Sequence, residues 1–215
     1  MQPLILIPCK SFAAGKSRLA PVLPPEGRDA LCRRFLADTV NLAEQLVARG
    51  NIHVVSSDLK VAELAADLGV HCHGDNDHDL NSALTSAAAR IVARNQVAGR
   101  NILILPIDLA FNSRVAIAPV LAVRADLVVV VPDRLDQGTN LLRLPGNVAA
   151  DFRFQYGDNS FSRHRSEAER HGLTVETLRD PAFCFDVDTP EDYAAWAAKT
   201  ASPAGFASRI ASLDP

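Results

Sequence analysis

Short apolar runs alternate with longer stretches of helical periodicity along most of the chain. The runs are rich in Val, Ile and Leu without polar alternation, which is typical of strands buried on both faces of a parallel sheet. They predict strands at Leu4–Ile7, Ile52–Val55, Val70–Cys72, Ile102–Leu105, Leu127–Val131 and Val175–Leu178. Because predicted strands alternate with stretches of helical periodicity along the sequence, we expect an α/β fold.

Glycines and capping residues mark the ends of the helices between these strands. We predict helices at about Glu26–Ala48, closed by Gly50, at Val61–Leu68, stopped by Gly69, at Ser82–Asn95 and Val115–Val123, from segment 154–160 to about His171, and from Pro190 to about Lys199. From about residue 200 onward the periodicity is weak, so we expect a loosely docked tail.

Composition and charge narrow the class of protein. A chain of 215 residues with 48% hydrophobic and 22% charged residues can bury one sizeable core in one or at most two domains. Its net charge of −3 gives no overall attraction to nucleic acid or to an anionic membrane. No apolar run approaches the roughly 20 residues of a membrane span, and no basic segment precedes the first apolar run. We expect a cytoplasmic protein without nucleic-acid or membrane partners.

The cysteines indicate neither a zinc site nor a disulfide framework. Cys9, Cys32, Cys72 and Cys184 are scattered and form no Cys-x-x-Cys pair. We interpret them as mostly buried free thiols of a reducing cytosol.

A basic loop follows the first predicted strand. It contains Lys10, Lys16 and Arg18, and its Gly15-Lys16-Ser17 resembles the end of a P-loop. The first glycine of that motif would fall at position 10, where Lys10 stands, which excludes a Walker A loop. Cationic side chains and backbone N–H groups after a first strand can still bind phosphates. The alternative is a solvated basic loop.

Two carboxylates, Asp186 and Asp188, directly precede a helix start. Thr189 suits the N-cap, Pro190 the first helical position, and Asp192 can complete a capping box. Alternate side chains of an extended segment point to the same side, so the two carboxylates repel each other unless a cation lies between them. Their hard oxygen ligands suit magnesium or calcium. The alternative is that both aspartates lie on a loop before the helix cap.

Two further positions are candidates for ligand binding. Asp108 follows the predicted central strand, and ligands of open α/β sheets gather at the carboxyl ends of strands. Gly157 and Ser160 precede a predicted helix, whose N-terminus can bind an anion. A turn with an N-cap serine explains the second pair almost as well.

The histidines carry less information. His71, His73 and His78 lie near three aspartates, but their spacing fits no metal-ligand pattern, so we predict a solvated loop. His164 and His171 on the predicted helix are interpreted as surface residues.

These landmarks together resemble the 2-phospho-L-lactate guanylyltransferase family, which makes the activated intermediate of the deazaflavin coenzyme F420 and has variants acting on phosphoenolpyruvate or 3-phosphoglycerate. The resemblance extends from residue 4 to about residue 196. It rests on Ile7-Pro8-x-Lys10, Lys16-Ser17-Arg18-Leu19, Asp79-Leu80-Asn81, Ala83-Leu84, Asp108-Leu109, Pro132-Asp133-Arg134, Gly138-Thr139-Asn140, Tyr156-Gly157-x-x-Ser160, His164, Glu167-Ala168 and Phe185-Asp186-Val187-Asp188-Thr189-Pro190-Glu191-Asp192.

The resemblance implies a fold, a reaction and a set of site residues. The fold would be that of the nucleotide-diphospho-sugar transferases, a three-layer α/β structure with a mixed, mostly parallel sheet, and we expect residues 1–215 to form a single nucleotidyltransferase domain. GMP would pass from GTP to a small phosphorylated three-carbon acid with release of pyrophosphate. Magnesium would bind to Asp108, Asp186 and Asp188. The acceptor would bind at Thr139, Gly157 and Ser160.

The chemistry expected of the remaining candidates follows from charge. An acceptor phosphate is already an anionic nucleophile, so the difficulty is its repulsion by the triphosphate. We expect Lys10, Lys16 and Arg18 to act with Asp108 and the metal in neutralising that repulsion. Asn81 is a further candidate for substrate binding.

Two departures from the family pattern concern the acceptor. Ala110 stands where the family usually has a proline, and Asp136-Gln137 replace a Gly-Thr pair. Asp136 would repel an anionic acceptor unless it turns outward or meets a cation such as Arg134. The Gln137 amide could hydrogen-bond an extra hydroxyl, which adds 3-phosphoglycerate to phospholactate and phosphoenolpyruvate as a candidate.

Two other functions stay open. Nucleotidyltransferases that make molybdopterin dinucleotides or cytidylyl products share the fold and the aspartates, but they favour a glycine-rich first loop, and this one has only Gly15. A non-catalytic nucleotide-binding module is the other alternative. The acceptor, the residues that read the guanine base and the oligomeric state, including a homo-oligomer, are not determined by these patterns.

Overall fold

A computed structural model describes the chain except for residues 1, 75–78, 96–98, 110–112, 184 and 202–215. The expected tail lies almost entirely outside the described residues, as do Ala110 and His78. None of the described helices combines the length and the apolar character that crossing a bilayer requires.

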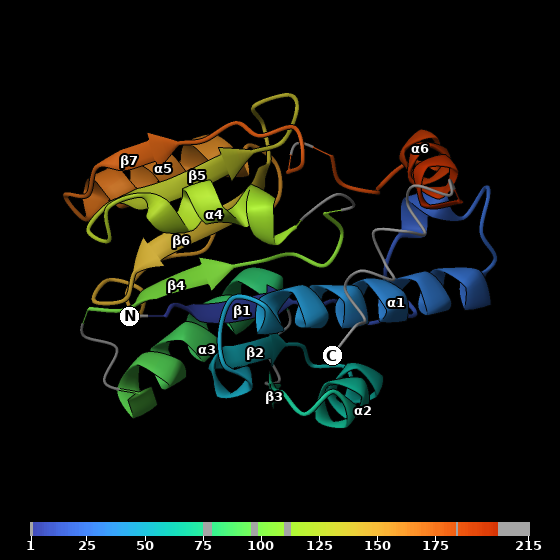
Figure 1. Cartoon of the computed structure of the whole chain (residues 1–215), viewed down its shortest axis with the longest axis horizontal. Coiled ribbons are helices and arrows are strands. Elements are labelled where there is room, and N and C mark those ends of the chain that lie inside the picture. The colour runs from blue at the N-terminus through green and yellow to red at the C-terminus, as the bar shows by residue number, and fades with distance from the viewer. Residues whose placement is uncertain (1, 75–78, 96–98, 110–112, 184, 202–215) are drawn as a thin grey trace.

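In the described part of the chain, seven strands form one mixed sheet (Figure 1) in the order β3-β2-β1-β4-β6-β5-β7. The strands are β1 (Leu4–Pro8), β2 (Ile52–Val55), β3 (His71–His73), β4 (Asn101–Ile104), β5 (Val128–Pro132), β6 (Thr139–Pro145) and β7 (Val175–Thr177). Only β6 is antiparallel to its neighbours, so the expected mixed and mostly parallel sheet is confirmed.

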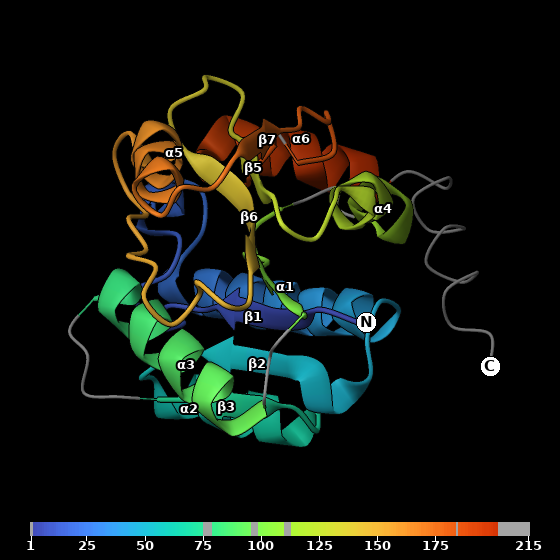
Figure 2. The same cartoon turned by 90° about the vertical axis from the view of Figure 1, so that its left-hand side faces the viewer.

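Helices cover both faces of the sheet, which gives the expected three layers (Figures 1 and 2). They are η1 (Ser17–Leu19), α1 (Pro25–Glu44), η2 (Arg49–Asn51), α2 (Leu59–Asp67), α3 (Leu80–Asn95), α4 (Arg114–Ala122), α5 (Ser160–Arg170) and α6 (Pro190–Ala201). Helices α1, α2 and α4 pack on one face, and α3 and α5 pack on the other.

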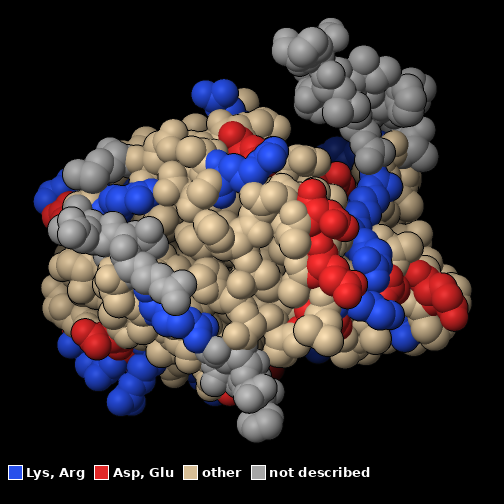
Figure 3. Space-filling view, turned by 90° about the horizontal axis from the view of Figure 1, so that it is seen from below, with Lys and Arg blue, Asp and Glu red and all other residues tan. Residues whose placement is uncertain are grey.

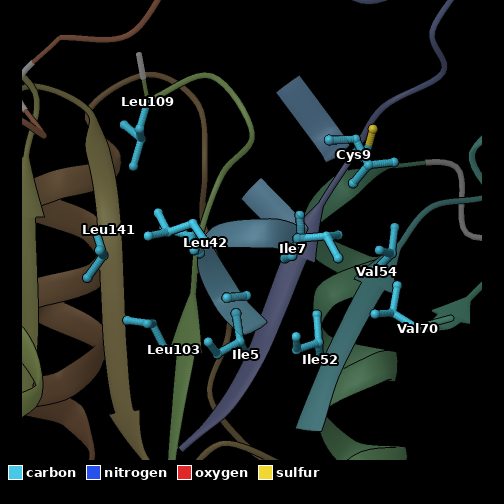
Figure 4. Close-up of a cluster of buried hydrophobic side chains, with 14 of the residues drawn as sticks. Ile5, Ile7, Cys9, Leu42, Ile52, Val54, Val70, Leu103, Leu109 and Leu141 are labelled. Carbon is cyan, nitrogen blue, oxygen red and sulfur yellow. The ribbon is translucent and has the colours of Figure 1, made fainter. Parts of the chain in front are cut away.

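The strands bury both faces because their apolar runs do not alternate with polar residues. Ile5 and Ile7 of β1 point into the core below α1, while Leu4 and Leu6 point into the core below α3. Figure 4 shows the first of these cores, with Leu103 of β4 beside the β1 side chains. Burying one such side chain contributes roughly 1.5–3 kcal/mol, so these runs fix the sheet.

A third apolar cluster places the C-terminal helix beside the basic loop. Leu19 of η1, Phe35 of α1, and Val187 and Trp196 are buried together. The rings of Phe35 and Trp196 meet edge to face, with centroids 5.2 Å apart. This cluster holds α6 next to the loop after β1, beyond the carboxyl ends of the parallel strands (Figure 1).

One helix ends earlier than predicted. Helix α1 stops at Glu44, not near Ala48, and Gly50 lies inside η2 instead of closing α1. After Glu44 the backbone tightens to bonds such as Gln45 N–H to Leu42 C=O, and this turn buries Val47 in the core. The burial of Val47 therefore decides where α1 ends.

Strand β6 begins directly after the loop that contains Asp136 and Gln137. Thr139 and Asn140 already pair as strand residues, and both are buried. Arg143 further along β6 is buried as well, and its guanidinium donates to the Val120, Val123 and Arg124 carbonyls at the end of α4. These bonds satisfy the open carbonyls of the helix end and hold α4 on the sheet.

Charges of both signs lie side by side on the face shown in Figure 3, where no broad region carries a single sign.

Candidate active site

Two adjoining cavities open around the loop that follows β1. The larger, of about 550 Å³, extends from Lys16 and Asp108 to Thr139 and Ser160. The smaller, of about 500 Å³, lies toward the end of β2, and both cavities are lined by Lys10. Together they form one cleft at the carboxyl ends of the parallel strands, where ligands of α/β proteins are expected.

Backbone pairing brings the two acidic segments of the sequence together. Leu109 and Asp186 form an antiparallel bridge, and the Val187 N–H donates to the Asp108 carbonyl over 3.1 Å. Segment 186–188 therefore lies beside Asp108 and Leu109, which follow β4 in the chain. This places Asp186 and Asp188 in the larger cavity with Asp108, as the sequence predicts.

Lys16 lies between two of these carboxylates. Its Nζ is 2.6 Å from Asp108 Oδ2 and 3.2 Å from Asp188 Oδ1, and its side chain is only 7% exposed. Burial lowers the pKa of Lys16, but the two carboxylates outweigh burial and raise the pKa above its ordinary value. The ammonium is therefore a fixed positive charge that joins the end of β4 to the segment before α6.

Local backbone structure aims Lys16 at the aspartates. Lys16 has a left-handed backbone conformation (φ 52°) directly before η1. At Gly15, an added Cβ would lie 2.7 Å from Cys32 Sγ of α1, so the loop can press against α1 only with glycine there. The glycine that resembles part of a P-loop is thus explained by close packing.

The other two cations of the loop differ from Lys16 in exposure. Arg18 Nη1 is 2.9 Å from Asp188 Oδ2, while its side chain is 74% exposed. Lys10 is exposed at the junction of the two cavities and makes no ion pair with any described residue. Lys10 and Arg18 can therefore reach a ligand in the cleft without leaving a buried position.

The pKa of Asp186 reflects its burial and the repulsion among the three carboxylates Asp108, Asp186 and Asp188. Burial raises its pKa, and the neighbouring Asp108 and Asp188 charges raise the pKa further. Three carboxylates with one buried ammonium leave an excess of negative charge. A further cation would stabilise this arrangement.

The residues fit magnesium that is shared with a substrate. Within the residues that the structure describes, no three His, Cys, Asp or Glu side chains enclose a metal ion by themselves. Magnesium commonly uses one or two carboxylates and completes its shell with waters and substrate phosphates. Asp108 and Asp188, which already share the charge of Lys16, are suited to such binding, with Asp186 beside them.

The capping box predicted at α6 is present. The Thr189 N–H and hydroxyl donate to Asp192 Oδ2 at 2.9 and 2.8 Å, and the Asp192 N–H donates back to Thr189 Oγ1 at 3.3 Å. The Asp188 N–H also donates to this carboxylate, over 3.3 Å. The cap therefore fixes the backbone of Asp188.

A carboxylate also organises the loop before β6. Asp133 accepts bonds from the N–H groups of Leu135, Gln137 and Gly138 at 2.9–3.0 Å. A Cβ on Gly138 would lie 2.8 Å from Asp133 Oδ2, so only glycine allows this wrapping. The loop delivers Thr139 to the cleft.

Thr139 and Ser160 are brought together, as the resemblance implies. The Thr139 N–H donates to Ser160 Oγ over 2.9 Å, and both residues are among those that line the larger cavity, together with Gly157. Gly157 has a φ of 118°, which favours glycine, and the turn it makes leads into α5.

The interpretation of His164 as a surface residue is wrong. Its ring is fully buried, and its nitrogens contact the Gln155 N–H and Thr139 Oγ1, each at 2.9 Å. Arg163 and Arg165 flank His164 in the sequence, but the His164 side chain itself faces segment 152–156. The helical period indicates such an inward face, and Phe161 and Ala168 on the same face are the signal that could have identified it.

Asn81 uses its side-chain amide within the protein. Its Nδ2 donates to the Tyr156 carbonyl at 3.0 Å, and its Oδ1 accepts from the Tyr156 N–H at 2.7 Å. Asn81 thereby ties α3 to the segment before α5, beside the smaller cavity. Substrate binding by Asn81 stays a prediction.

The two unusual loop residues, Asp136 and Gln137, are not among the residues that line the larger cavity. Asp136 pairs with Arg179 at 2.9 Å, not with Arg134, which instead lies 3.4 Å from Asp192. Gln137 is exposed and is not among the residues lining the larger cavity. A hydrogen bond from this amide to an acceptor hydroxyl stays a prediction.

Other candidate residues serve the fold. His71 lies on β3, within the predicted strand, whereas His73 lies at the end of β3 instead of on the predicted loop; His53 Nδ1 is 3.0 Å from His73 Nε2. Cys9 and Cys32 are buried free thiols, as expected, and Cys72 is a half-buried one; Cys184 lies outside the described residues.

Comparison with known proteins agrees with this arrangement. Phosphoenolpyruvate guanylyltransferase of Rubrobacter xylanophilus is 35% identical over 90% of this chain and 93% of its own. The 2-phospho-L-lactate guanylyltransferase of Methanothermobacter thermautotrophicus is 30% identical over 89% of this chain and 82% of its own. A solved structure described as a nucleotide-diphospho-sugar transferase, from Desulfovibrio desulfuricans G20, has a TM-score of 0.67 at 18% identity and covers 93% of this chain and 87% of its own.

This likeness confirms the expected nucleotide-diphospho-sugar transferase fold. The sequence pattern described as guanylyl transferase CofC like matches residues 3–197, and the chain belongs to this family of nucleotidyltransferases.

Proposed function

We propose that the protein transfers GMP from GTP to a small phosphorylated three-carbon acid and releases pyrophosphate, as a step in the biosynthesis of coenzyme F420. The observation that carries this proposal is the meeting of Asp108, Asp186, Asp188 and Lys16 in the cleft that also contains Thr139 and Ser160. Family membership supports the reaction class.

The two cavities suggest how the substrates divide the cleft. The smaller one lies over β1 and β2 and is lined mostly by neutral side chains, including Ser56 and Ser57, which suits a nucleoside. The larger one contains the charged groups together with the Thr139 and Ser160 hydroxyls, which suits phosphates and the acid. Lys10 at their junction is positioned for the triphosphate between them.

The reaction needs charge neutralisation more than proton transfer. An oxygen of the acceptor phosphate attacks the α-phosphorus of GTP, and the bond from this phosphorus to the bridging oxygen of the β-phosphate breaks. The attacking oxygen is already anionic, so no general base is required. Lys10 and Arg18 would offset the negative charge of the phosphates, and Lys16 keeps the carboxylates in register.

Magnesium, held by Asp108 and Asp188 with Asp186 beside them, would supply the Lewis-acid charge that weakens the repulsion between acceptor and triphosphate. The protein contributes a rigid frame for those carboxylates. The bridge at Leu109 fixes the backbone of Asp186, and the cap at Asp192 fixes the backbone of Asp188.

The acceptor is proposed to be phosphoenolpyruvate or 2-phospho-L-lactate. Relatives named for these two acids match the chain at similar identity, 35% and 30% in the cases above. The argument for 3-phosphoglycerate depended on Gln137, whose exposed side chain does not line the larger cavity. Both favoured acids present a phosphate and a carboxylate for the hydroxyl donors.

Pyrophosphate release with each of the four nucleoside triphosphates against each of the three acids tests the proposal. We expect turnover with GTP and with phosphoenolpyruvate or 2-phospho-L-lactate, and a metal requirement met by magnesium. Preference for CTP would indicate a cytidylyltransferase instead. Nucleotide binding without turnover in any combination would favour a non-catalytic module.

A further inference from the structure

His164 is the one fully buried histidine in the described part of the chain, and it touches a residue of the cleft. Its ring packs against Tyr156 and Phe152, with centroid distances of 4.8 and 6.1 Å. Burial lowers the pKa of His164 to about 4, so the ring is neutral and carries one proton at physiological pH.

The hydrogen-bond network decides which ring nitrogen carries that proton. The backbone N–H of Gln155 can only donate, and it lies 2.9 Å from His164 Nε2. Nε2 is therefore the acceptor, and the proton of the neutral ring is on Nδ1. Nδ1 lies 2.9 Å from Thr139 Oγ1, so the ring donates to the hydroxyl oxygen.

This donation determines the direction of the Thr139 hydroxyl hydrogen. A hydroxyl that accepts from Nδ1–H cannot donate back to it, and its hydrogen has no other acceptor among the described residues. Ser160 is in the same situation, because its oxygen accepts from the Thr139 N–H at 2.9 Å. Both residues are among those that line the larger cavity, so a ligand in this cavity is the candidate acceptor for both hydrogens.

We propose that His164 is a positioning residue that turns the Thr139 hydroxyl into a donor toward the anionic group of the acceptor acid. This inference rests on the proposed function. With Ser160 beside it, the result is a pair of donors for which the described residues offer no acceptor, and such a pair favours a phosphate or carboxylate oxygen over a neutral hydroxyl.

Two substitutions of His164 separate the positioning role from mere packing. His164→Asn can keep an amide donor near the place of Nδ1, whereas His164→Gln can keep an acceptor near the place of Nε2 but has no donor for Thr139. We expect the Gln variant to raise KM for the acid roughly 10-fold, as for one lost hydrogen bond, with KM for GTP nearly unchanged. The Asn variant should stay close to the wild type.

A double-mutant cycle with Thr139→Val tests whether His164 acts through Thr139. If it does, His164→Gln adds nothing further to KM for the acid once the hydroxyl is absent. Equal losses in the Asn and Gln variants, or an undiminished Gln effect in the Thr139→Val background, would overturn the proposal.

The wild-type protein provides a readout that needs no His164 variant. Two-dimensional ¹H–¹⁵N NMR of histidine-labelled protein at pH 7 should show the His164 ring protonated on Nδ1 and bare on Nε2, with the signal assigned through substitutions of the other five histidines. An Nε2-protonated or cationic ring overturns the inference. Should the wild type release no pyrophosphate, the proposed function fails, while the tautomer still decides the direction of the hydroxyl.

Discussion

Two regions of the cleft are built from different interactions. In the first, the carboxylate wall, Asp108 and Asp188 are joined by the ammonium of Lys16. In the second, the hydroxyl wall, Thr139 is held by neutral bonds to Ser160 and His164. The carboxylate wall keeps excess negative charge and depends on cations, whereas the hydroxyl wall depends on which hydrogen-bond partners are protonated. We therefore expect metal and salt to affect the carboxylate wall, and acid to affect the hydroxyl wall.

The largest effect is expected from removing charge at the carboxylate wall. Asp188→Asn should lower kcat by about 10²–10³, because losing a preorganised electrostatic contact commonly costs that much. The fold should persist, since Asp188 contributes charge and not core packing. Steady-state kinetics at saturating magnesium measures the loss.

Asp151→Asn is the matched control, because Asp151 is an exposed aspartate outside the cleft. A rate for Asp188→Asn above half that of the wild type would remove this residue from the catalytic machinery.

Acid should destabilise the protein through buried histidines. Burial lowers the pKa values of His53 and His164 to about 4, from an ordinary value of 6.5. Between these pH values the unfolded chain binds more protons, so stability falls as pH drops from 6.5 toward 4. Each histidine should contribute up to about 1.4 kcal/mol per pH unit.

Denaturant unfolding at several pH values measures this slope. His164→Gln should make the slope shallower, since the variant has no group that titrates there. An unchanged slope would show that the buried His164 ring does not cause the loss of stability at low pH.

The exposed cation of the carboxylate wall should matter to a smaller degree. Arg18→Ala should weaken GTP binding by roughly 10-fold in calorimetry, as for one charged hydrogen bond, and the difference should shrink with added salt. Arg163→Ala, which removes an exposed arginine without an ion pair among the described residues, is the control. Equal affinities for GTP in both variants would favour the alternative that the loop is a solvated surface loop.

Much of the fold was predictable because it depends on local sequence. The buried strands follow from uninterrupted apolar runs, and the α6 cap follows from the order of Thr189, Pro190 and Asp192. The end of α1 was predicted wrongly, because the burial of Val47 outweighs helical periodicity there.

The site was less predictable because it depends on long-range pairing. Nothing near Asp186 shows that its segment will pair beside Leu109, and only the family resemblance joined the two. Nor does the basic loop reveal that Lys16 meets carboxylates while Arg18 stays exposed. His164 was missed because its neighbours in sequence are charged, although its partners in space are not.

The smallest effect is expected at Gln137, and it sharpens the comparison by marking where the hydroxyl wall ends. The backbone of Gln137 is engaged, since its N–H donates to Asp133 Oδ1 at 2.9 Å and its carbonyl accepts from the Phe161 N–H at 3.0 Å. Gln137→Ala keeps both bonds and removes only an exposed side chain. The kcat/KM values for phosphoenolpyruvate, 2-phospho-L-lactate and 3-phosphoglycerate should therefore each stay within about 2-fold of the wild-type values, as for other surface substitutions. Their ranking should not change. Thr139→Val, two residues further along at the start of β6, should lower kcat/KM for whichever acid is used. A selective loss of 3-phosphoglycerate in the Gln137 variant would mean that this amide reaches the acceptor after all, and that the hydroxyl wall extends into the loop.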